Sequence, residues 1–227
     1  MKRLLALFAV IVVIGGCTSS ENVDAAKVLR DGGAAMGQLK SANATLKLTK
    51  GTVTIQTFKL VSAKTSVRLP SESDTIYTVK EQDVSFGLQV VIVPGHVYLH
   101  VPFSHFQEVT GPDAQAFPDM AKLFDPMTGL PAVIPQGTDP KYVSTEQVDG
   151  QDCYQIHTTY TAAEVRSLIS ELDSSGPVDA HVWVGTSDHL IRKAVLSGAF
   201  GDNGTDATVE VNISSFNGPV VITSPTP

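Results

Sequence analysis

Cys17 is the residue whose surroundings most clearly predict a chemical modification. Two positive residues precede an unbroken apolar run from Leu4 to Ile14, and two glycines lead from it to Cys17. This arrangement is typical of a secretory signal peptide, and the run is too short to span a membrane as a helix. The segment Ile14-Gly15-Gly16-Cys17 looks like a bacterial lipobox, whose cysteine receives diacylglycerol. The alternative is an ordinary signal peptide followed by a chance cysteine. We expect a signal peptide over residues 1–16 and an acylated cysteine with a linker over residues 17–22.

Cys153 and three histidines are the other residues that invite a chemical interpretation. With Cys17 acylated, Cys153 has no disulfide partner within the chain, so we expect a buried and inert thiol. On a strand, His96 and His100 would share a face, with His105 close behind them. A zinc site needs three or four convergent ligands, and no further cysteine or carboxylate is spaced to complete one. We therefore expect no metal site.

Catalytic and cofactor-binding motifs do not stand out in the sequence. It contains no G-x-S-x-G nucleophile elbow and no glycine-rich phosphate loop. The pair Asp188-His189 follows a strand pattern, where an aspartate favours a turn over a catalytic role. We expect neither an enzyme nor a cofactor.

The charge balance narrows the class of partner. Without Lys2 and Arg3, 14 basic residues stand against 23 acidic ones, which gives a net charge of −9. Such a surface argues against nucleic acid and against electrostatic binding to anionic lipid head groups. A lipid partner would have to be held by apolar burial. The mature chain has about 210 residues, which suits one domain with a sizeable core, over residues 23–227.

The first half of the mature chain predicts a helix and then an antiparallel meander. Asn22 is the expected cap of a helix that runs to about Lys40. From Asn43 onward apolar and polar residues alternate, as on strands with one covered face. The clearest alternating set is followed by a Pro94-Gly95 turn, and it consists of Val84, Phe86, Leu88, Val90 and Ile92.

The second half combines a proline-rich middle segment with further strands. Seven prolines between Pro102 and Pro140 divide short helices expected over residues 114–124 and 130–134. A capping box at Thr161 and Glu164 begins a helix whose buried stripe includes Leu172 and which Gly176-Pro177 ends. Strands are expected over residues 142–148, 154–158, 178–185, 190–200, 205–215 and 220–223, with a hairpin turn at 202–204.

These elements predict an α+β fold with a large antiparallel sheet and helices on one face. The middle segment contributes a methionine-rich cluster, which comprises Met120, Leu123, Phe124, Met127 and Leu130. The cluster is either ordinary core or a soft lid over a cavity, because methionine adapts to irregular apolar ligands. The alternating set on residues 84–92 has the same two interpretations, since cavity walls and cores use the same residue types.

Three stretches resemble the LppX/LprA/LprF/LprG family of mycobacterial-type cell-envelope lipoproteins. The first runs from Gly111 into Phe124–Leu130, the second is Val178–Val184 with Asp188-His189, and the third is Ile213–Asn217 leading to Val220. Their order and spacing cover nearly all of the mature chain. The sequence departs from the family pattern at Phe216, where tryptophan is common.

The resemblance implies a half-barrel sheet with helices over its concave face and an apolar cavity between them. It implies a lipoprotein of the cell membrane, anchored through Cys17 on the extracytoplasmic face, that carries lipids or glycolipids with long acyl chains outward from the inner membrane. A membrane lipid transporter is a further candidate partner. The residues we expect to contact acyl chains are Phe86, Leu88, Val90, Ile92, Met120, Phe124 and Met127. The alternative is a structural or adaptor lipoprotein with a filled core that docks to an envelope transporter.

Overall fold

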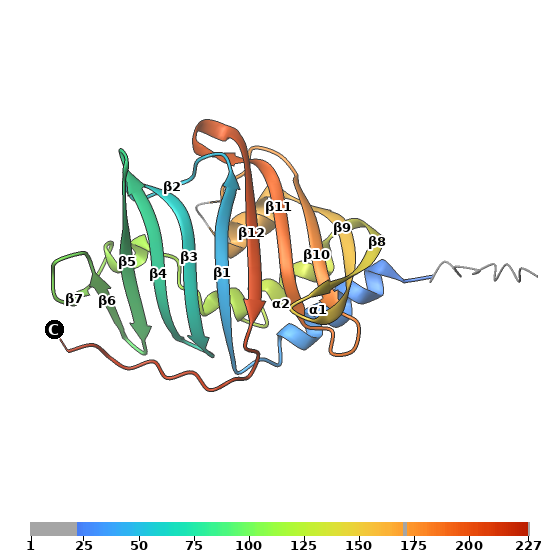
Figure 1. Cartoon of the computed structure of the whole chain (residues 1–227), viewed down its shortest axis with the longest axis horizontal. Helices are drawn as coiled ribbons and strands as arrows, with labels where there is room; N and C mark the ends of the chain where they lie inside the picture. Colours follow the sequence, from blue (N-terminus) through green and yellow to red (C-terminus); the bar gives the residue numbers. More distant parts are fainter. Residues whose placement is uncertain (1–21, 170–171, 227) are drawn as a thin grey trace, which may run out of the picture.

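One antiparallel sheet forms most of the molecule. The structure is a computed structural model, and it describes residues 22–169 and 172–226. Within these residues, twelve strands form a curved sheet in the order β7-β6-β5-β4-β3-β1-β12-β11-β10-β9-β8, with β2 paired to β3 (Figure 1). The strands are β1 (Ser41–Lys50), β2 (Thr54–Ile55), β3 (Phe58–Arg68), β4 (Glu72–Glu81), β5 (Val84–Val93), β6 (His96–His100), β7 (Gln107–Val109), β8 (Thr138–Val148), β9 (Gln151–Tyr160), β10 (Val178–Gly185), β11 (Ile191–Gly201) and β12 (Thr205–Ser214).

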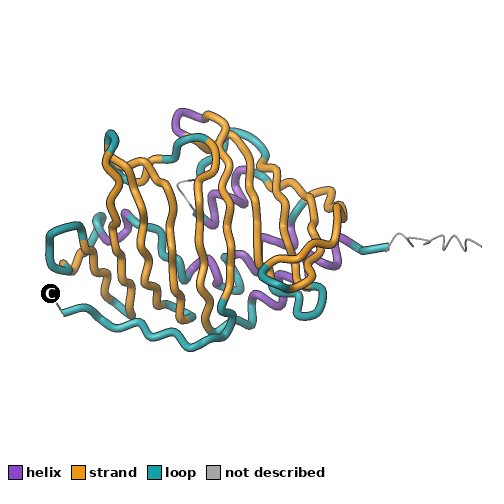
Figure 2. Tube along the Cα trace, in the orientation of Figure 1, coloured by secondary structure: helices purple, strands orange, loops and turns teal. Residues whose placement is uncertain are grey.

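The helices lie on one face of this sheet. Figure 2 shows them together behind the strands. They are α1 (Ala25–Met36), α2 (Leu130–Val133) and α3 (Ala162–Leu168), with the 3-10 turns η1 (Ala114–Ala116), η2 (Lys122–Phe124) and η3 (Ile134–Gln136), while η4 (Asp202–Gly204) forms the β11–β12 hairpin turn. No described helix is long and apolar enough to cross a membrane.

The first and last strands of the chain pair at the centre of the sheet. The register places Ala44 of β1 opposite Ile213 of β12. From this pair, β3 to β7 form one meander and β11 to β8 form the other. Strand alternation turns one apolar set toward the helices and leaves a mostly polar outer face. The predicted α+β fold with a half-barrel sheet is confirmed.

Helix ends differ from the sequence predictions at both ends of α1, which stops at Met36 and not near Lys40, and at the end of α3. The α1 cap is Asp24 and not Asn22, because the Asp24 side chain accepts a hydrogen bond from the Lys27 amide at 2.9 Å. The capping box at Thr161 and Glu164 is confirmed. However, α3 ends at Leu168, where the next residue turns to extended dihedrals, well before the predicted stop at Gly176-Pro177.

The C-terminal segment is not the strand predicted over residues 220–223. It leaves β12 and runs along one end of the strands to the β5–β6 side of the sheet (Figure 1). Asn217 fastens its start, since its side chain accepts from the Lys40 amide at 2.8 Å. Further on, Ile222 is buried against Val91 and Tyr98 on the outer face. The apolar residues in this segment cover one small patch and do not extend the sheet.

Candidate functional site

The middle of the concave face is a smooth apolar wall. Strands β1, β11 and β12 are neighbours there, and every second residue of each points toward the helices. The inward residues that line the wall are Ala44 and Leu46 of β1, Leu196 of β11, and Val209, Val211 and Ile213 of β12. Short and β-branched side chains on these strands leave space between the sheet and its cover.

The cover is made by the proline-rich middle segment and by α3. The middle segment contributes Met120, Leu123, Phe124 and Leu130, and α3 contributes Val165 and Leu168. Ile169 and Leu172, just beyond α3, continue this apolar surface. Ile169 and Leu172 thus both reach the space under the sheet.

Two adjoining cavities lie between wall and cover. Their volumes are about 60 and 70 Å³. The first lies under β1, β3 and β12, and the second extends under β10 and β11. Both are lined by Leu130, Val165, Leu168, Leu196, Val211 and Ile213, so only side chains separate them. The lining is hydrocarbon except for the Met120 thioether and the Tyr160 hydroxyl.

Few polar bonds hold the cover to the sheet. The Tyr160 hydroxyl donates to the Ile134 carbonyl at 2.9 Å, and the Tyr77 hydroxyl donates to the Pro118 carbonyl at 3.2 Å. Burial raises the pKa of Tyr160 far above its ordinary value, so this hydroxyl keeps its proton and remains a donor. The Gln56 amide donates to the Ala116 carbonyl at 2.9 Å. Among the described residues, the apolar contacts between wall and cover make up much of the remaining attachment, and such contacts permit small displacements.

A polar hollow opens beside the apolar cavities. It has a volume of about 520 Å³ and includes Lys122, Arg166, Ser167 and Gln115 in its lining. Leu168 also lines both apolar cavities, so its side chain stands between them and the hollow. Arg166 pairs with the exposed Asp173 at 3.1 Å. Asp119 also lines the hollow and lies 3.7 Å from Lys122 Nζ. The arrangement offers a dry compartment and a wet, charged one side by side.

The sequence-predicted site residues separate into three groups. Met120 and Phe124 line the first cavity. Leu88 and Val90 face the covered side and are buried in the core cluster around Tyr77 and Val79, but they line neither apolar cavity.

The other three predicted residues lie further from the cavities. Phe86 packs edge-on against Phe58, with ring centroids 5.1 Å apart, and Ile92 borders the polar hollow. Met127 is 82% exposed and lines none of these spaces. The cavity is therefore centred under β1, β11 and β12 and not under β5.

The wall residues on β11 and β12 were the ones that sequence reasoning missed. Val209, Val211 and Ile213 alternate as regularly as the residues of β5. Alternation identifies the covered face of a strand, but it carries no information about which strands lie at the sheet centre. That order depends on the pairing of β1 with β12, which is a long-range feature.

Cys153 and the histidines singled out in the sequence do not come together in one site among the described residues. Cys17 and the predicted signal peptide lie outside the described residues. Cys153 is fully buried, as expected, and burial raises the pKa of its thiol. His96 pairs with Glu108 at 2.8 Å, and the His100 ring packs against Phe106. These two histidines thus each contact a different partner.

Comparison with known proteins decides the family. A sequence profile described as "LppX_LprAFG lipoprotein" matches residues 24–222. The chain belongs to the LppX_LprAFG lipoprotein family. The resemblance in the sequence motifs is confirmed by this match.

Relatives and solved structures agree with this family. The lipoarabinomannan carrier protein LprG of Mycobacterium tuberculosis is 25% identical over 235 residues, covering 99% of this chain and 95% of the relative. LprG of Mycobacterium leprae is 22% identical over 99% of this chain and 96% of its own. LprF from Mycobacterium bovis has the same fold, with a TM-score of 0.71 and 18% identity over 89% of this chain and 97% of LprF. For LppX from Mycobacterium tuberculosis the TM-score is 0.63, with 18% identity over 87% of this chain and 97% of LppX.

Proposed function

We propose that this LppX_LprAFG family member is a lipid carrier that holds acyl chains between the sheet and its helical cover. The observation that carries the proposal is the pair of adjoining, almost wholly hydrocarbon cavities under β1, β11 and β12. Relatives over nearly the whole chain are named lipoarabinomannan carrier proteins, which supports a lipid or lipoglycan as the cargo.

Binding would work by desolvation of the acyl chain. Each buried methylene contributes roughly 0.8 kcal/mol, so a chain of many methylenes gains enough to leave a membrane. The acidic mature chain offers little attraction to anionic membrane surfaces, which favours apolar burial as the driving force.

The cover must move outward to admit a long chain. Engineered cavities of about 150 Å³ hold a benzene molecule, and drug-sized ligands occupy about 300–1,000 Å³. The present cavities of about 60 and 70 Å³ are smaller than either. Displacement of α3 and the middle segment from the sheet would merge them, and Leu168 would be the first side chain to yield because it borders all three spaces.

The polar hollow would receive the head group. Its charged and polar lining suits a hydroxyl-rich group, or an anionic group that replaces Asp119 and Asp173 as partners of Lys122 and Arg166. Leu168 marks the entrance for the acyl chain. The lining of the apolar cavities favours binding over catalysis. Among its described residues, the one candidate for a general acid or base is the buried Tyr160, and this tyrosine keeps its proton.

The anchor completes the proposal. Cys17 would be acylated and, once residues 1–16 are removed, would form the lipidated N-terminus that holds the domain at the extracytoplasmic face of the cell membrane. The cargo would then pass outward from the inner membrane, with a membrane lipid transporter as a candidate donor or acceptor.

A second candidate is an adaptor lipoprotein with a filled core that docks to an envelope transporter. The observation that favours it is the small volume of both cavities, since side chains already fill most of the space under the sheet. The two functions differ in one measurable respect, which is whether the folded protein takes up an acyl chain.

Native mass spectrometry of the non-acylated Cys17→Ala protein, with a parallel displacement assay using a fluorescent fatty acid, tests the carrier. We expect one bound lipid per protein and saturable displacement. Val211→Phe, which places a ring at a position that lines both cavities, should abolish uptake while the protein stays folded. Val90→Phe, at an inward position on β5 that lines neither cavity, should lower stability yet leave uptake per folded molecule unchanged. No bound lipid in the parent protein, or equal loss of uptake in both variants, would favour the adaptor.

A further inference from the structure

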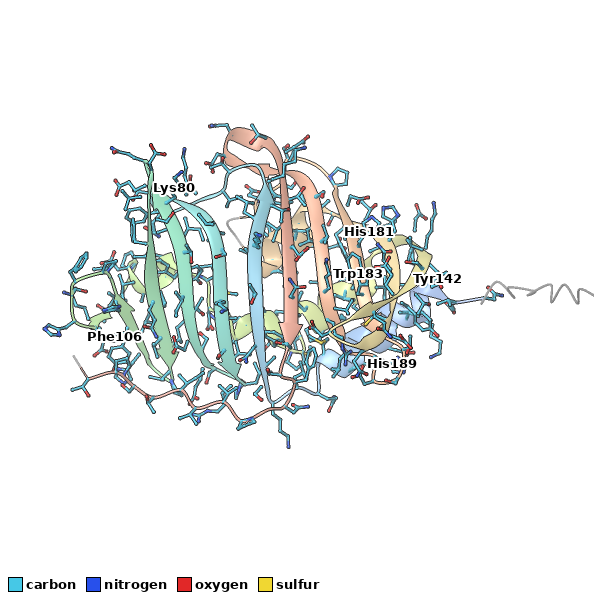
Figure 3. The ribbon with its side chains drawn as sticks, viewed as in Figure 1. Lys80, Phe106, Tyr142, His181, Trp183 and His189 are labelled. Atoms are coloured by element: carbon cyan, nitrogen blue, oxygen red, sulfur yellow. The ribbon has the colours of Figure 1, made fainter. Side chains whose placement is uncertain are left out.

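A cluster of two histidines and one aspartate lies on the outer face of the sheet. His157 belongs to β9, and Asp179 and His181 belong to β10. The register places His157 directly opposite His181, and Asp179 is two residues from His181 and therefore on the same face. Val178, Ala180 and Val182 fill the alternate positions and point into the core. Figure 3 labels His181 and Trp183 along this strand.

The three side chains converge on a common point. His157 Nε2 lies 2.5 Å from Asp179 Oδ2, and His181 Nε2 lies 3.9 Å from Asp179 Oδ1. One ligand atom from each residue lies within 4.8 Å of the other two. The rings of His157 and His181 are 4.9 Å apart between centroids. The side chains are 34%, 50% and 35% exposed in the order His157, Asp179 and His181, so an ion and a water molecule can reach them from solvent.

A second layer of hydrogen bonds holds His181 in place. Its Nδ1 lies 3.0 Å from the Gln155 side-chain amide, which lies 2.9 Å from the Ser144 hydroxyl. That hydroxyl donates to Glu146 at 3.0 Å, and Glu146 also accepts from Trp183 Nε1 at 3.0 Å. Such outer partners orient a ligating imidazole and select its tautomer.

The same network can supply the tautomer that a metal needs. A half-turn of the Gln155 amide places its oxygen toward His181 and its NH₂ group toward the Ser144 hydroxyl. His181 Nδ1–H then donates to the amide oxygen, while Ser144 keeps its own proton for Glu146. Nε2 is left with its lone pair facing Asp179 and His157.

We propose that His157, Asp179 and His181 form a binding site for a divalent transition-metal ion, with Zn²⁺ as the ion that this set fits best. Two imidazoles and one carboxylate, with water in the fourth position, make a tetrahedral zinc environment. Donor atoms around zinc lie roughly 3.3 Å apart, as follows from metal–ligand distances of about 2.0–2.1 Å, so modest side-chain rotations suffice. Calcium and magnesium favour all-oxygen sites and fit poorly. The proposal departs from the sequence expectation of no metal site, because the strand register that joins these residues is not visible in their spacing.

Isothermal titration of the metal-free Cys17→Ala protein, without a histidine tag, with ZnCl₂ tests the site. We expect one ion per protein. Asp179→Asn, which keeps the side-chain shape, and His181→Ala should each weaken binding at least tenfold, and Gln155→Ala should weaken it about 10–100-fold through the second layer. His96→Ala removes an exposed histidine–glutamate pair elsewhere on the sheet and should leave binding unchanged.

The visible spectrum of the Co²⁺-loaded protein gives an independent readout. A tetrahedral ligand field that Asp179→Asn removes would support the site even if His181→Ala failed to fold. Absence of binding in the parent protein would overturn the proposal. It would also be overturned if binding survived Asp179→Asn, or if His96→Ala weakened binding as much as His181→Ala. None of these measurements depends on lipid uptake.

Discussion

Arg192 is a charged residue buried on β11, with only 7% of its surface exposed. Asp188 holds its guanidinium through two hydrogen bonds, of 2.6 and 2.9 Å, and the Phe216 ring lies 5.5 Å from its Cζ atom. This Arg192 hydrogen bond lowers the pKa of Asp188 below its ordinary value, although burial opposes the effect. A glycine is needed at position 185, because a Cβ there would collide with the side chains of Asp188 and Arg192. The sequence predicted a turn at Asp188-His189, which is confirmed by the left-handed His189, but the buried arginine was not visible in the local pattern.

Asp188→Asn should destabilise the fold by about 1–3 kcal/mol at pH 7, because a buried guanidinium loses its charged partner. A carboxylate whose pKa is lowered on folding stabilises above its unfolded pKa of about 3.9, and this stability is lost as pH falls through the folded pKa. The gap between variant and parent should therefore shrink below about pH 4. Urea unfolding of both proteins at pH 7 and pH 3 measures it. A gap that stays constant or widens in acid would contradict the ion pair.

Cys153 presents a thiol with no access to solvent. Because burial raises its pKa, the reactive thiolate is scarce in the folded protein. In the Cys17→Ala protein, we expect a maleimide to react with Cys153 only after denaturation. Cys153→Ser should fold with a loss of about 1–2 kcal/mol, since a hydroxyl in this site costs more than a thiol. Rapid labelling of the native protein, or a disulfide-linked dimer on a non-reducing gel, would contradict an inert thiol.

At the scale of elements, α3 is a piece of the cover that cannot stand on its own. It is seven residues long, below the length at which an isolated helix is stable, so it depends on its cap and its apolar contacts. Thr161 and Glu164 satisfy each other's backbone donors at its start. The capping signature and the buried Val165 were both predictable from sequence, because they are local. The early end at Leu168 was not, since it depends on how the following residues pack under the sheet.

Thr161→Ala should loosen α3 and speed the uptake of an acyl probe. Loss of an N-cap costs about 0.5–2 kcal/mol, and 1 kcal/mol raises the displaced fraction of α3 about fivefold. Stopped-flow mixing with a fluorescent fatty acid measures the association rate. Asp24→Ala is the matched control, because it removes the cap of α1, whose residues line neither apolar cavity. Equal acceleration in both variants, or none in Thr161→Ala, would argue against α3 as the moving part.

At the scale of the whole molecule, the sequence predicted the type of architecture better than its arrangement. Period-two alternation is a local signal, so strand positions such as 178–185 were predicted correctly. Pairing order is a global property, so the cavity was expected under β5 when it lies under the sheet centre. The residues at 220–223 have strand-like composition, yet they cover Val91 and Tyr98 because no free edge is available beside β12.

Cys17→Ala tests the anchor of the whole molecule. Without the acceptor thiol, lipid attachment and cleavage before residue 17 should both fail, so the protein should carry no acyl label and should keep residues 1–16. Gel electrophoresis of protein from cells labelled with a radioactive fatty acid measures both effects, as loss of label and as a larger chain. Cys153→Ser, which removes the other cysteine, should remain labelled and membrane-bound. Continued labelling of Cys17→Ala would rule out this acylation site.

The pairing of β1 with β12 has a consequence for the order in which the protein is made. Leu46 and Val211 stand on opposite sides of this central seam, and the second is synthesised long after the first. Until residues 205–214 emerge, β1 has one unpaired edge and the two meanders are not joined. Such long-range closure is slow compared with hairpin formation. The compartment that we propose for the acyl chain therefore forms only when the chain is almost complete, and a nascent or C-terminally truncated chain would have no such compartment to load.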